Sequence, residues 1–279
     1  MIKINIGCHL SISNGFEHSA KMALSIDANT FQFFPRNPRG GRAVDFEILD
    51  IENFLEISQD NNFSKIVAHA PYTYNLCSAN PRVVKFSINC IKNDLENLEK
   101  LPENYYNIHP GSHTGQGIKI GIEKISQNLN DIILQNQSTI ILLETMSGKG
   151  SEVGGNFGDL KEIINNIDLK EKIGICLDTC HVFDSGYDIK NNLENVLENF
   201  DKLIGINRLK VIHLNDSKNL LNSKKDRHEN LGYGKIGISS IEKIVKNKYL
   251  EDLIFILETP QKDLLGYKSE INFLLNYVS

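Results

Sequence analysis

The stretch ICLDTCHVFDSGYD, Ile175–Asp188, begins as an apolar run and then changes character abruptly. Its first residues are typical of a buried strand, yet Asp178, Cys180 and His181 follow within four positions. A strand of the hydrophobic core that ends in an acid and an imidazole indicates that its last residues reach a functional face. The same pattern recurs along the chain.

Short apolar runs alternate with amphipathic stretches from one end of the sequence to the other. The runs are rich in Ile, Val, Leu and Phe without strict alternation, as expected of parallel strands buried on both faces. We expect strands at Ile2–His9, Thr30–Phe34, Lys65–His69, Tyr105–His109, Thr139–Glu144, Lys172–Asp178, Leu209–His213 and Asp252–Glu258.

Helical periodicity fills the intervals between these runs. The clearest helix is predicted over Pro81–Leu101, with Asn80 as its N-cap and Pro81 at its first position. Its apolar residues step by four, three, four and three: Val84, Ile88, Ile91, Leu95 and Leu98. A last helical stretch is predicted from Tyr267 to Val278.

The eight predicted strands therefore belong to eight strand–helix units. Their ends lie 25 to 45 residues apart, and no strand is followed by a GxGxxG or GxxxxGK[ST] nucleotide fingerprint. Eight parallel units of this period predict an α/β fold, a (β/α)8 TIM barrel, better than an open doubly wound sheet. Because no linker, charge block or change of composition interrupts the pattern, we expect residues 1–279 to form a single domain.

Metal-ligating residue types end six of the eight predicted strands. In a barrel all these ends face one rim, so the side chains should converge there. Asp226 and His228 lie in the loop after the seventh strand, and two residues apart on extended backbone they should point the same way. The candidate ligands are His69, His109, Glu144, Asp178, His181, His213, Asp226, His228 and Glu258.

Five histidines and four carboxylates exceed what one tetrahedral ion can use, and they suit two or three zinc-type ions. A single histidine at a strand end is more often a hydrogen-bonded structural residue, and a single acid there often caps the next helix. Repetition at six strand ends favours metal instead. Four carboxylates close together in a partly buried site at this rim would also repel one another by several kcal/mol without cations.

Neighbouring polar residues have simpler interpretations. We expect Cys180 to be a packing residue, His9 to pack or support the ligands, and Asn215 and Asp216 to brace their loop. His113 either orients a ligand or contacts substrate, and the sequence does not separate these two roles.

Composition sets the broad class of the protein. No apolar run approaches the ~20 residues that span a bilayer, and the first ten residues turn polar too early for a signal peptide, so we expect a cytoplasmic protein. The five cysteines form no CxxC pair and predict reduced, mostly buried thiols. The net charge of −5 by itself argues mildly against a polyanionic partner.

Together the motifs resemble the endonuclease IV family of apurinic/apyrimidinic endonucleases, over essentially the whole chain. The motifs that carry the resemblance are IGCHLSISNG, FFPRNPRG, HAPYTYNL, HPGSH, LETMSGKGSEVG, ICLDTCHVFDSGYD, HLNDSK with DRHENLGYGKIG, and ILETP. The resemblance implies a deoxyribonuclease IV of base excision repair that holds three zinc ions per chain.

The resemblance also implies which residues hold each ion. The first zinc would be bound by His69, His109 and Glu144. Glu144 would bridge to a second ion, completed by Asp178, His213 and Glu258. The third would be bound by His181, Asp226 and His228. A zinc-bridging hydroxide, tuned by Glu144, would then hydrolyse the phosphodiester 5′ to an abasic site in duplex DNA. The products would be a 3′-hydroxyl and a 5′-deoxyribose phosphate, and 3′ blocking groups would also be removed.

For DNA contacts the family pattern points to Arg36, Asn37, Arg39, Tyr72 and Arg227. Three zinc ions would change the net charge from −5 to about +1, concentrated at one rim. Tyr72 would help to fill the base stack once the lesion has left it. Gly40 and Gly41 replace the bulky residue often found in this loop of the family, which bears on how strongly the DNA is distorted.

The main alternative is a metal-dependent sugar isomerase or epimerase of the related TIM-barrel group. Such an enzyme needs one or two metals, so the set of His181, Asp226 and His228 would be superfluous. A non-catalytic damage-binding protein would have lost a ligand, and none is lost. We expect a monomer, because one active-site face suffices.

Overall fold

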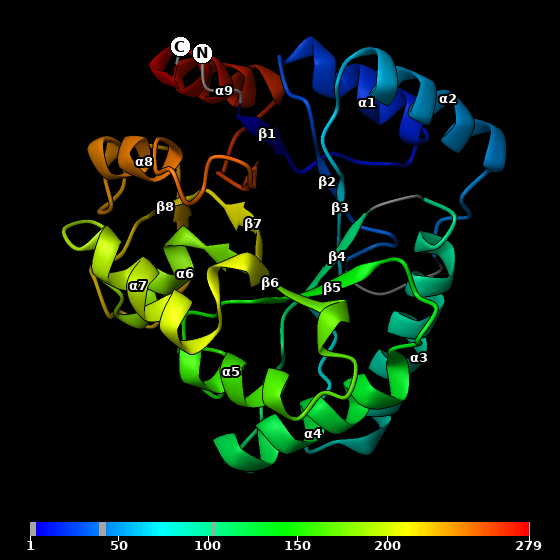
Figure 1. The fold of residues 1–279 in the computed structure, drawn as a ribbon, viewed down its shortest axis with the longest axis vertical. Coiled ribbons are helices and arrows are strands. Elements are labelled where there is room, and N and C mark those ends of the chain that lie inside the picture. Colours follow the sequence, from blue (N-terminus) through cyan, green and yellow to red (C-terminus); the bar gives the residue numbers. More distant parts are fainter. Residues whose placement is uncertain (1–3, 39–42, 102–103, 279) are drawn as a thin grey trace.

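The computed structural model describes residues 4–38, 43–101 and 104–278. Eight parallel strands form one sheet in the order β1-β10-β7-β6-β5-β4-β3-β2. Figure 1 shows the strands in the middle of the molecule and the helices around them. The strands are β1 Asn5–Cys8, β2 Gln32–Phe33, β3 Val67–His69, β4 Tyr105–Ile108, β5 Ile140–Glu144, β6 Ile173–Asp178, β7 Leu209–His213 and β10 Ile254–Leu257.

The two edges of this sheet meet at β1 and β2. A parallel bridge joins His9 to Gln32, and the Leu10 amide donates to the Gln32 carbonyl at 2.8 Å. The sheet is therefore a nearly closed (β/α)8 barrel, as predicted. Each of the eight strands lies inside the run that predicted it, shorter by at most a few residues at its ends.

Helices surround the barrel, one or more after each strand. They are α1 Phe16–Ser25, α2 Ile48–Asp60, α3 Pro81–Leu98, α4 Ile118–Ile132, α5 Phe157–Asn165, α6 Thr179–Ser185, α7 Leu193–Leu203, α8 Ile238–Val245 and α9 Leu264–Val278, with short 3-10 turns at Lys170–Lys172 and Ile206–Arg208. Helix α3 begins as predicted, because the Asn80 side chain accepts a hydrogen bond from the Arg82 amide at 3.0 Å. Helix α6 was not predicted, and it follows β6 without a loop.

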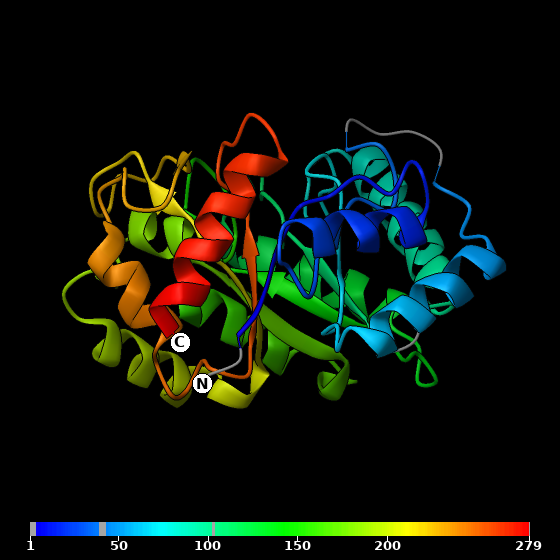
Figure 2. The same cartoon turned by 90° about the horizontal axis from the view of Figure 1, so that it is seen from above.

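Apolar side chains are divided between two regions. The larger cluster lies between the sheet and the helices and includes Phe16, Phe31, Phe33 and Phe157. A smaller cluster fills the inside of the barrel and consists of Val67, Leu142, Cys176, Val211, Ile254 and Ile256. In Figure 2 the C-terminal helix α9 lies across the side of the barrel near β1, which it contacts.

A small hairpin stands on the rim after β7. Strands β8 (Asp216–Ser217) and β9 (His228–Glu229) pair antiparallel. The buried Asp216 carboxylate accepts hydrogen bonds from the backbone amides of Gly232, Gly234, Ile236 and Gly237. At Gly234 a Cβ atom would lie 2.3 Å from Asp216 Oδ1, so this close approach requires glycine. Asp216 thus braces the loop, as predicted.

Two further expectations concern the chain as a whole. All five cysteines are free and buried, as predicted. Among the helices in the described part of the chain, none has the length and apolar character needed to cross a bilayer.

Candidate metal centre

The alternation of side chains along each strand carries the candidate ligands to one rim of the barrel. A residue of the inner apolar cluster precedes five of the ligands by two positions, so both side chains of each pair point into the barrel. The pairs are Val67 and His69, Leu142 and Glu144, Cys176 and Asp178, Val211 and His213, and Ile256 and Glu258. The apolar member fills the barrel, and the polar member lies above it at the carboxyl end of the strand.

Three residues from neighbouring strands form the first group of donor atoms. Glu144 Oε2 lies 3.2 Å from His69 Nε2 and 3.4 Å from His109 Nε2. All three ligand atoms lie within 4.8 Å of one another. These distances suit three ligands around one ion.

A second group surrounds the Nδ1 atom of His213. This atom lies 3.1 Å from Glu258 Oε2, 3.5 Å from Glu144 Oε1 and 3.8 Å from Asp178 Oδ2. Glu144 therefore presents one carboxylate oxygen to each group, as a bridging ligand would.

The third group lies between α6 and the hairpin. Asp226 Oδ1 is 3.1 Å from His181 Nε2 and 3.6 Å from His228 Nε2, and Asp178 Oδ2 is 3.5 Å from the same His228 nitrogen. The expected convergence is present, but the expected reason for it is wrong. Asp226 has a left-handed backbone with a φ of 60°, so extended geometry does not align it with His228.

The loop itself gives Asp226 its direction. The buried carboxylate of Asp184 accepts hydrogen bonds from the Asp226 amide at 2.9 Å, from the Asn219 side chain at 2.9 Å and from the Ser217 hydroxyl at 2.6 Å. Asp184 lies on α6, three residues beyond His181. Helix α6 therefore supplies one ligand, His181, and also holds the loop that supplies a second ligand, Asp226.

The Cys180 sulfur also lies within 4.8 Å of ligand atoms of Asp226 and His228. Its side chain is fully buried, and burial raises the pKa of this thiol to about 12. This agrees with the expectation that Cys180 is a packing residue.

Several imidazoles are oriented by a hydrogen bond from Nδ1 to a backbone carbonyl. The Nδ1 atom of His69 lies 2.7 Å from the Ala70 carbonyl, that of His181 lies 2.9 Å from the Thr145 carbonyl, and that of His228 lies 3.3 Å from the Glu258 carbonyl. A carbonyl only accepts hydrogen bonds, so each Nδ1 carries a proton, and that of His181 also lies 3.1 Å from Glu144 Oε1. In the neutral form of each ring the lone pair is then on Nε2, where it can bind a metal.

The donor set fits divalent cations. The buried Nδ1 of His213 and Nε2 of His228 have no hydrogen-bond partner, although buried polar atoms nearly always do. Every described ion pair of the nine residues joins a histidine to an acid, with no lysine or arginine among them. Imidazole and carboxylate donors are those that zinc uses.

The pKa shifts within the cluster also indicate a site for cations. Burial by itself would raise the pKa of Glu144, but His109, His213 and His181 hold it well below its ordinary value. Burial by itself would lower the pKa of His181, yet Asp178, Asp226 and Glu144 raise it well above its ordinary value. The carboxylates thus need positive charge, which protons on the histidines or metal ions can provide.

Three carboxamides support the ligands, and the sequence predicted none of these three contacts. Asn107 Nδ2 donates to Glu144 Oε2 at 2.6 Å, and Gln32 Nε2 donates to Glu258 Oε1 at 2.7 Å. Asn215, expected only to brace its loop, donates to Asp178 Oδ2 at 2.8 Å. A polar residue within an otherwise apolar strand, as in FQFF and YYNI, was the signal available in the sequence.

The remaining histidines lie outside the cluster of donors. His9 is partly buried beside the Gln32 side chain, with its Nδ1 atom 3.3 Å from Gln32 Nε2, in agreement with a supporting role. His113 Nδ1 accepts a hydrogen bond from the Gly117 amide at 3.1 Å and so stabilises its own loop.

The residues expected to contact DNA occupy different environments. Tyr72 is 57% exposed in the loop after β3, and Asn37 and Arg227 are exposed. Arg36 differs from the expectation, because its side chain is 6% exposed and its guanidinium pairs with the buried Asp94 of α3. Arg39 and its neighbours Gly40, Gly41 and Arg42 lie outside the described residues.

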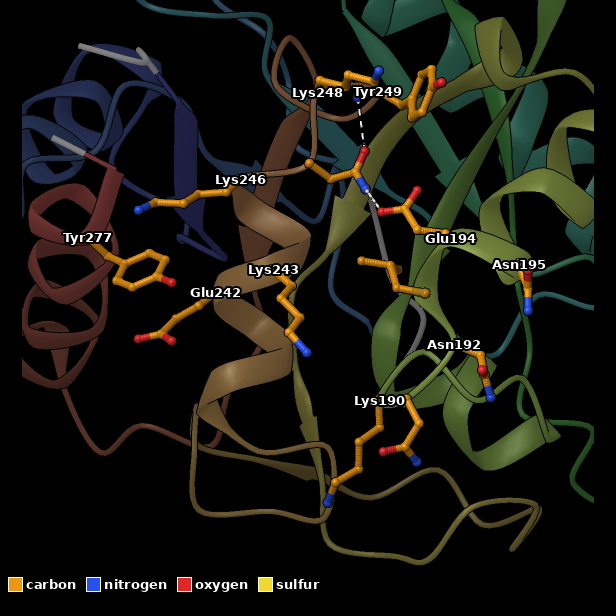
Figure 3. Close-up of a pocket in the computed structure, with 13 residues that line it drawn as sticks. Lys190, Asn192, Glu194, Asn195, Glu242, Lys243, Lys246, Lys248, Tyr249 and Tyr277 are labelled. Carbon is orange, nitrogen blue, oxygen red and sulfur yellow. Dashed lines mark hydrogen bonds between the residues drawn. The ribbon is translucent and has the colours of Figure 1, made fainter.

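A hollow of about 640 Å³ lies outside the barrel between α7, α8 and α9, and none of the nine ligands lines it. Figure 3 shows four lysines around it: Lys190, Lys243, Lys246 and Lys248. Its polar groups largely bind one another, since Asn247 donates to Glu194 at 2.9 Å and the Lys246 amine lies over the Tyr277 ring. We assign it no part in the chemistry.

Comparison with known proteins agrees with this geometry. Residues 20–277 match the model of a family described as a xylose isomerase-like TIM barrel. The chain is 54% identical over 271 residues to "Probable endonuclease 4" of Clostridium botulinum, covering 97% of this chain and 98% of that protein. It is 53% identical over 269 residues to "Probable endonuclease 4" of Methanosphaera stadtmanae, covering 96% and 97%.

Solved structures give the same result at the level of the fold. Endonuclease IV from Thermus thermophilus superposes with a TM-score of 0.86 at 28% identity, covering 98% of both chains. A D-psicose 3-epimerase from Clostridium cellulolyticum superposes with a TM-score of 0.68 at 10% identity, covering 99% of this chain and 100% of the epimerase. The second likeness shows the shared barrel alone.

Proposed function

The chain belongs to the endonuclease IV family, and from this premise we propose that it is a zinc-dependent DNA repair enzyme acting on abasic sites. It would cut the phosphodiester on the 5′ side of an abasic site in duplex DNA, leaving a 3′-hydroxyl and a 5′-deoxyribose phosphate. Removal of 3′ blocking groups, a monomeric state and a cytoplasmic location belong to the same proposal, as does a single functional domain over residues 1–279.

One observation carries the proposal: nine donor residues converge at one rim, with Glu144 in contact with histidines of more than one group. A single ion cannot use them all. We propose three zinc ions. His69, His109 and Glu144 would hold one, Glu144, Asp178, His213 and Glu258 a second, and His181, Asp226 and His228 the third.

Bound zinc supplies Lewis acidity, which lowers the pKa of water towards neutrality and offsets charge on a phosphate. The protein contributes the geometry around it. Glu144 keeps two donor groups at a fixed separation, and the carbonyls bound by His69, His181 and His228 hold those rings in a single tautomer. Asn107 and Gln32 keep two carboxylates oriented.

DNA would approach the same rim. Tyr72 is exposed there, and Arg227 lies between two ligands with Nη1 3.1 Å from the Asp226 carbonyl. We propose that Asn37, Arg39, Tyr72 and Arg227 contact DNA, and that Arg36 supports the loop after β2 from inside. An abasic nucleotide stacks poorly, so moving it out of the helix costs less than the few kcal/mol needed for an intact one, which gives selectivity.

The deciding experiment is incision of a labelled duplex that carries a tetrahydrofuran abasic analogue. We expect cleavage 5′ to the analogue by the zinc-loaded protein without added magnesium, loss of cleavage after chelation, and recovery on return of zinc. The same duplex without the lesion is the control.

Failure of the zinc-replete protein to cut would contradict the proposal. About one metal per chain together with isomerisation of a ketose would instead favour a sugar isomerase or epimerase. Such an enzyme has no use for the third donor group of His181, Asp226 and His228.

A further inference from the structure

A glutamine inside the barrel touches two of the proposed ligands. Gln32 lies on β2 and is completely buried. Its neighbours pack on the surrounding helices: Phe33 against Phe16 and Phe31 against Phe54, with ring centroids 5.2 and 6.0 Å apart. Because side chains alternate along a strand, Gln32 faces the opposite way, into the barrel.

The hydrogen bonds of Gln32 can be satisfied in one arrangement only. A carboxylate accepts but does not donate, so the Gln32 amide nitrogen must face Glu258 Oε1, at 2.7 Å. The amide oxygen then faces His213 Nε2, at 2.8 Å. An amide oxygen also only accepts, so His213 Nε2 must carry the ring proton.

The tautomer of His213 follows from this chain of donors. With its proton on Nε2, the neutral ring has its lone pair on Nδ1. This is the buried nitrogen that has no hydrogen-bond partner and that faces Glu144, Asp178 and Glu258. Gln32 thereby turns the ligating nitrogen of His213 towards the cluster and orients Glu258 beside it.

His213 differs here from three other histidines of the cluster. His69, His181 and His228 are oriented by backbone carbonyls, which no substitution removes. His213 depends on a side chain. Its metal-binding nitrogen would also be Nδ1, whereas in those three rings it would be Nε2, since their Nδ1 atoms donate to carbonyls.

We propose that Gln32 is a positioning residue of the metal centre, which fixes the tautomer of His213 and the orientation of Glu258. The inference rests on the proposed zinc centre and adds to it a residue that binds no metal itself. The backbone of Gln32 also forms the bridge to His9 that joins β1 and β2, the two edge strands of the sheet. Gln32 therefore contributes to barrel closure through its backbone and to the second donor group through its side chain.

The test replaces Gln32 by methionine, which keeps the length and flexibility of the side chain and removes both hydrogen bonds. We expect Gln32→Met to release at least one zinc about 10–100-fold more readily than wild type in a chelator competition followed by metal analysis. The matched control is Gln137→Met. Gln137 is another buried glutamine, bonded to the Thr139 carbonyl just before β5, remote from the ligands. It should lower the melting temperature and leave zinc retention unchanged.

A spectroscopic measurement keeps the inference testable if Gln32→Met folds poorly. In wild-type protein loaded with zinc, ¹⁵N chemical shifts of His213 should show a protonated Nε2 and a metal-bound Nδ1. Zinc bound through Nε2, or zinc retention in folded Gln32→Met equal to that of wild type, would overturn the role of Gln32 alone. Wild-type protein that takes up no zinc would overturn the centre itself, so the two failures are distinguishable.

Discussion

At the scale of single residues, Glu144 has the central position. It is almost fully buried, it ends β5, and its two oxygens face different donor groups. Its nearest partners are histidines and the amide of Asn107, which donates at 2.6 Å. No other carboxylate of the described cluster lies within 3.5 Å of as many histidines. Loss of its charge should therefore affect more than one ion.

Glu144→Gln keeps the shape of the side chain and replaces an anionic ligand with a neutral amide. We expect the zinc content to fall by at least one ion per chain, and incision to fall by about a hundredfold or more. Metal analysis and the incision assay check this, with circular dichroism to establish folding. Glu99→Gln is the control, because Glu99 bonds backbone amides at the other end of the barrel. Full activity with three zinc ions would remove Glu144 from the mechanism.

At the scale of elements, a buried polar network joins the loops after β2 and β3 to the helix behind them. Asp94 of α3 accepts from Arg36 Nε at 2.8 Å, from the Tyr106 hydroxyl at 2.7 Å and from the Tyr74 hydroxyl at 3.2 Å. Arg36 lies one residue before Asn37, and Tyr74 lies two residues after Tyr72. The network therefore supports both loops proposed to contact DNA, from inside the protein.

Asp94→Asn would remove the buried negative charge with which the Arg36 guanidinium pairs. We expect a loss of about 3–5 kcal/mol in the free energy of unfolding, measured by urea denaturation. The double variant Arg36→Met with Asp94→Leu removes both charges and should recover part of this loss. A cost below about 1 kcal/mol for Asp94→Asn, or no recovery in the double variant, would contradict a buried ion pair that supports these loops.

At the scale of the whole molecule, the metal centre links strands that are far apart in sequence. Residues as distant as His69 and Glu258 face each other across the rim. A ligand that binds only the folded chain stabilises it, by about 4 kcal/mol when its concentration is a thousand times its dissociation constant. Zinc bound at this rim should therefore hold the barrel closed as well as serve catalysis.

Chelation should lower the melting temperature by roughly 10 °C at pH 8, and by less at pH 6. The pKa of His181 is raised well above its ordinary value in the metal-free fold by Asp178, Asp226 and Glu144, against the effect of burial. The stability from its protonated form is complete below about pH 6.5 and is lost as the pH rises through the raised value. Protons also compete with zinc for this nitrogen, so zinc binds more tightly as the pH rises.

Both effects increase the difference in melting temperature between zinc-loaded and chelated protein as the pH rises. Calorimetry at several pH values measures this difference. A difference in melting temperature that decreases from pH 6 to pH 8 would contradict zinc binding by His181.

The sequence alone determined the eight strands, the barrel and the nine candidate ligands. Each of these is a local feature: an apolar run, its period and the residue that ends it, as in Leu142 and Glu144. In a barrel the residues that end the strands lie close together, because all carboxyl ends of the strands face one rim. The shared motifs also sufficed to indicate the family.

Only the tertiary structure decided which polar groups meet. Arg36 resembles a surface cation in sequence, but it lies inside against Asp94, which is 58 positions away. Gln32 and His213 are 181 positions apart, and only closure of the barrel brings β2 within reach of β7. Asp226 reaches His181 through a left-handed turn held by Asp184. Hydrogen bonds depend on distances of a few ångströms between distant segments, and no local pattern encodes those distances.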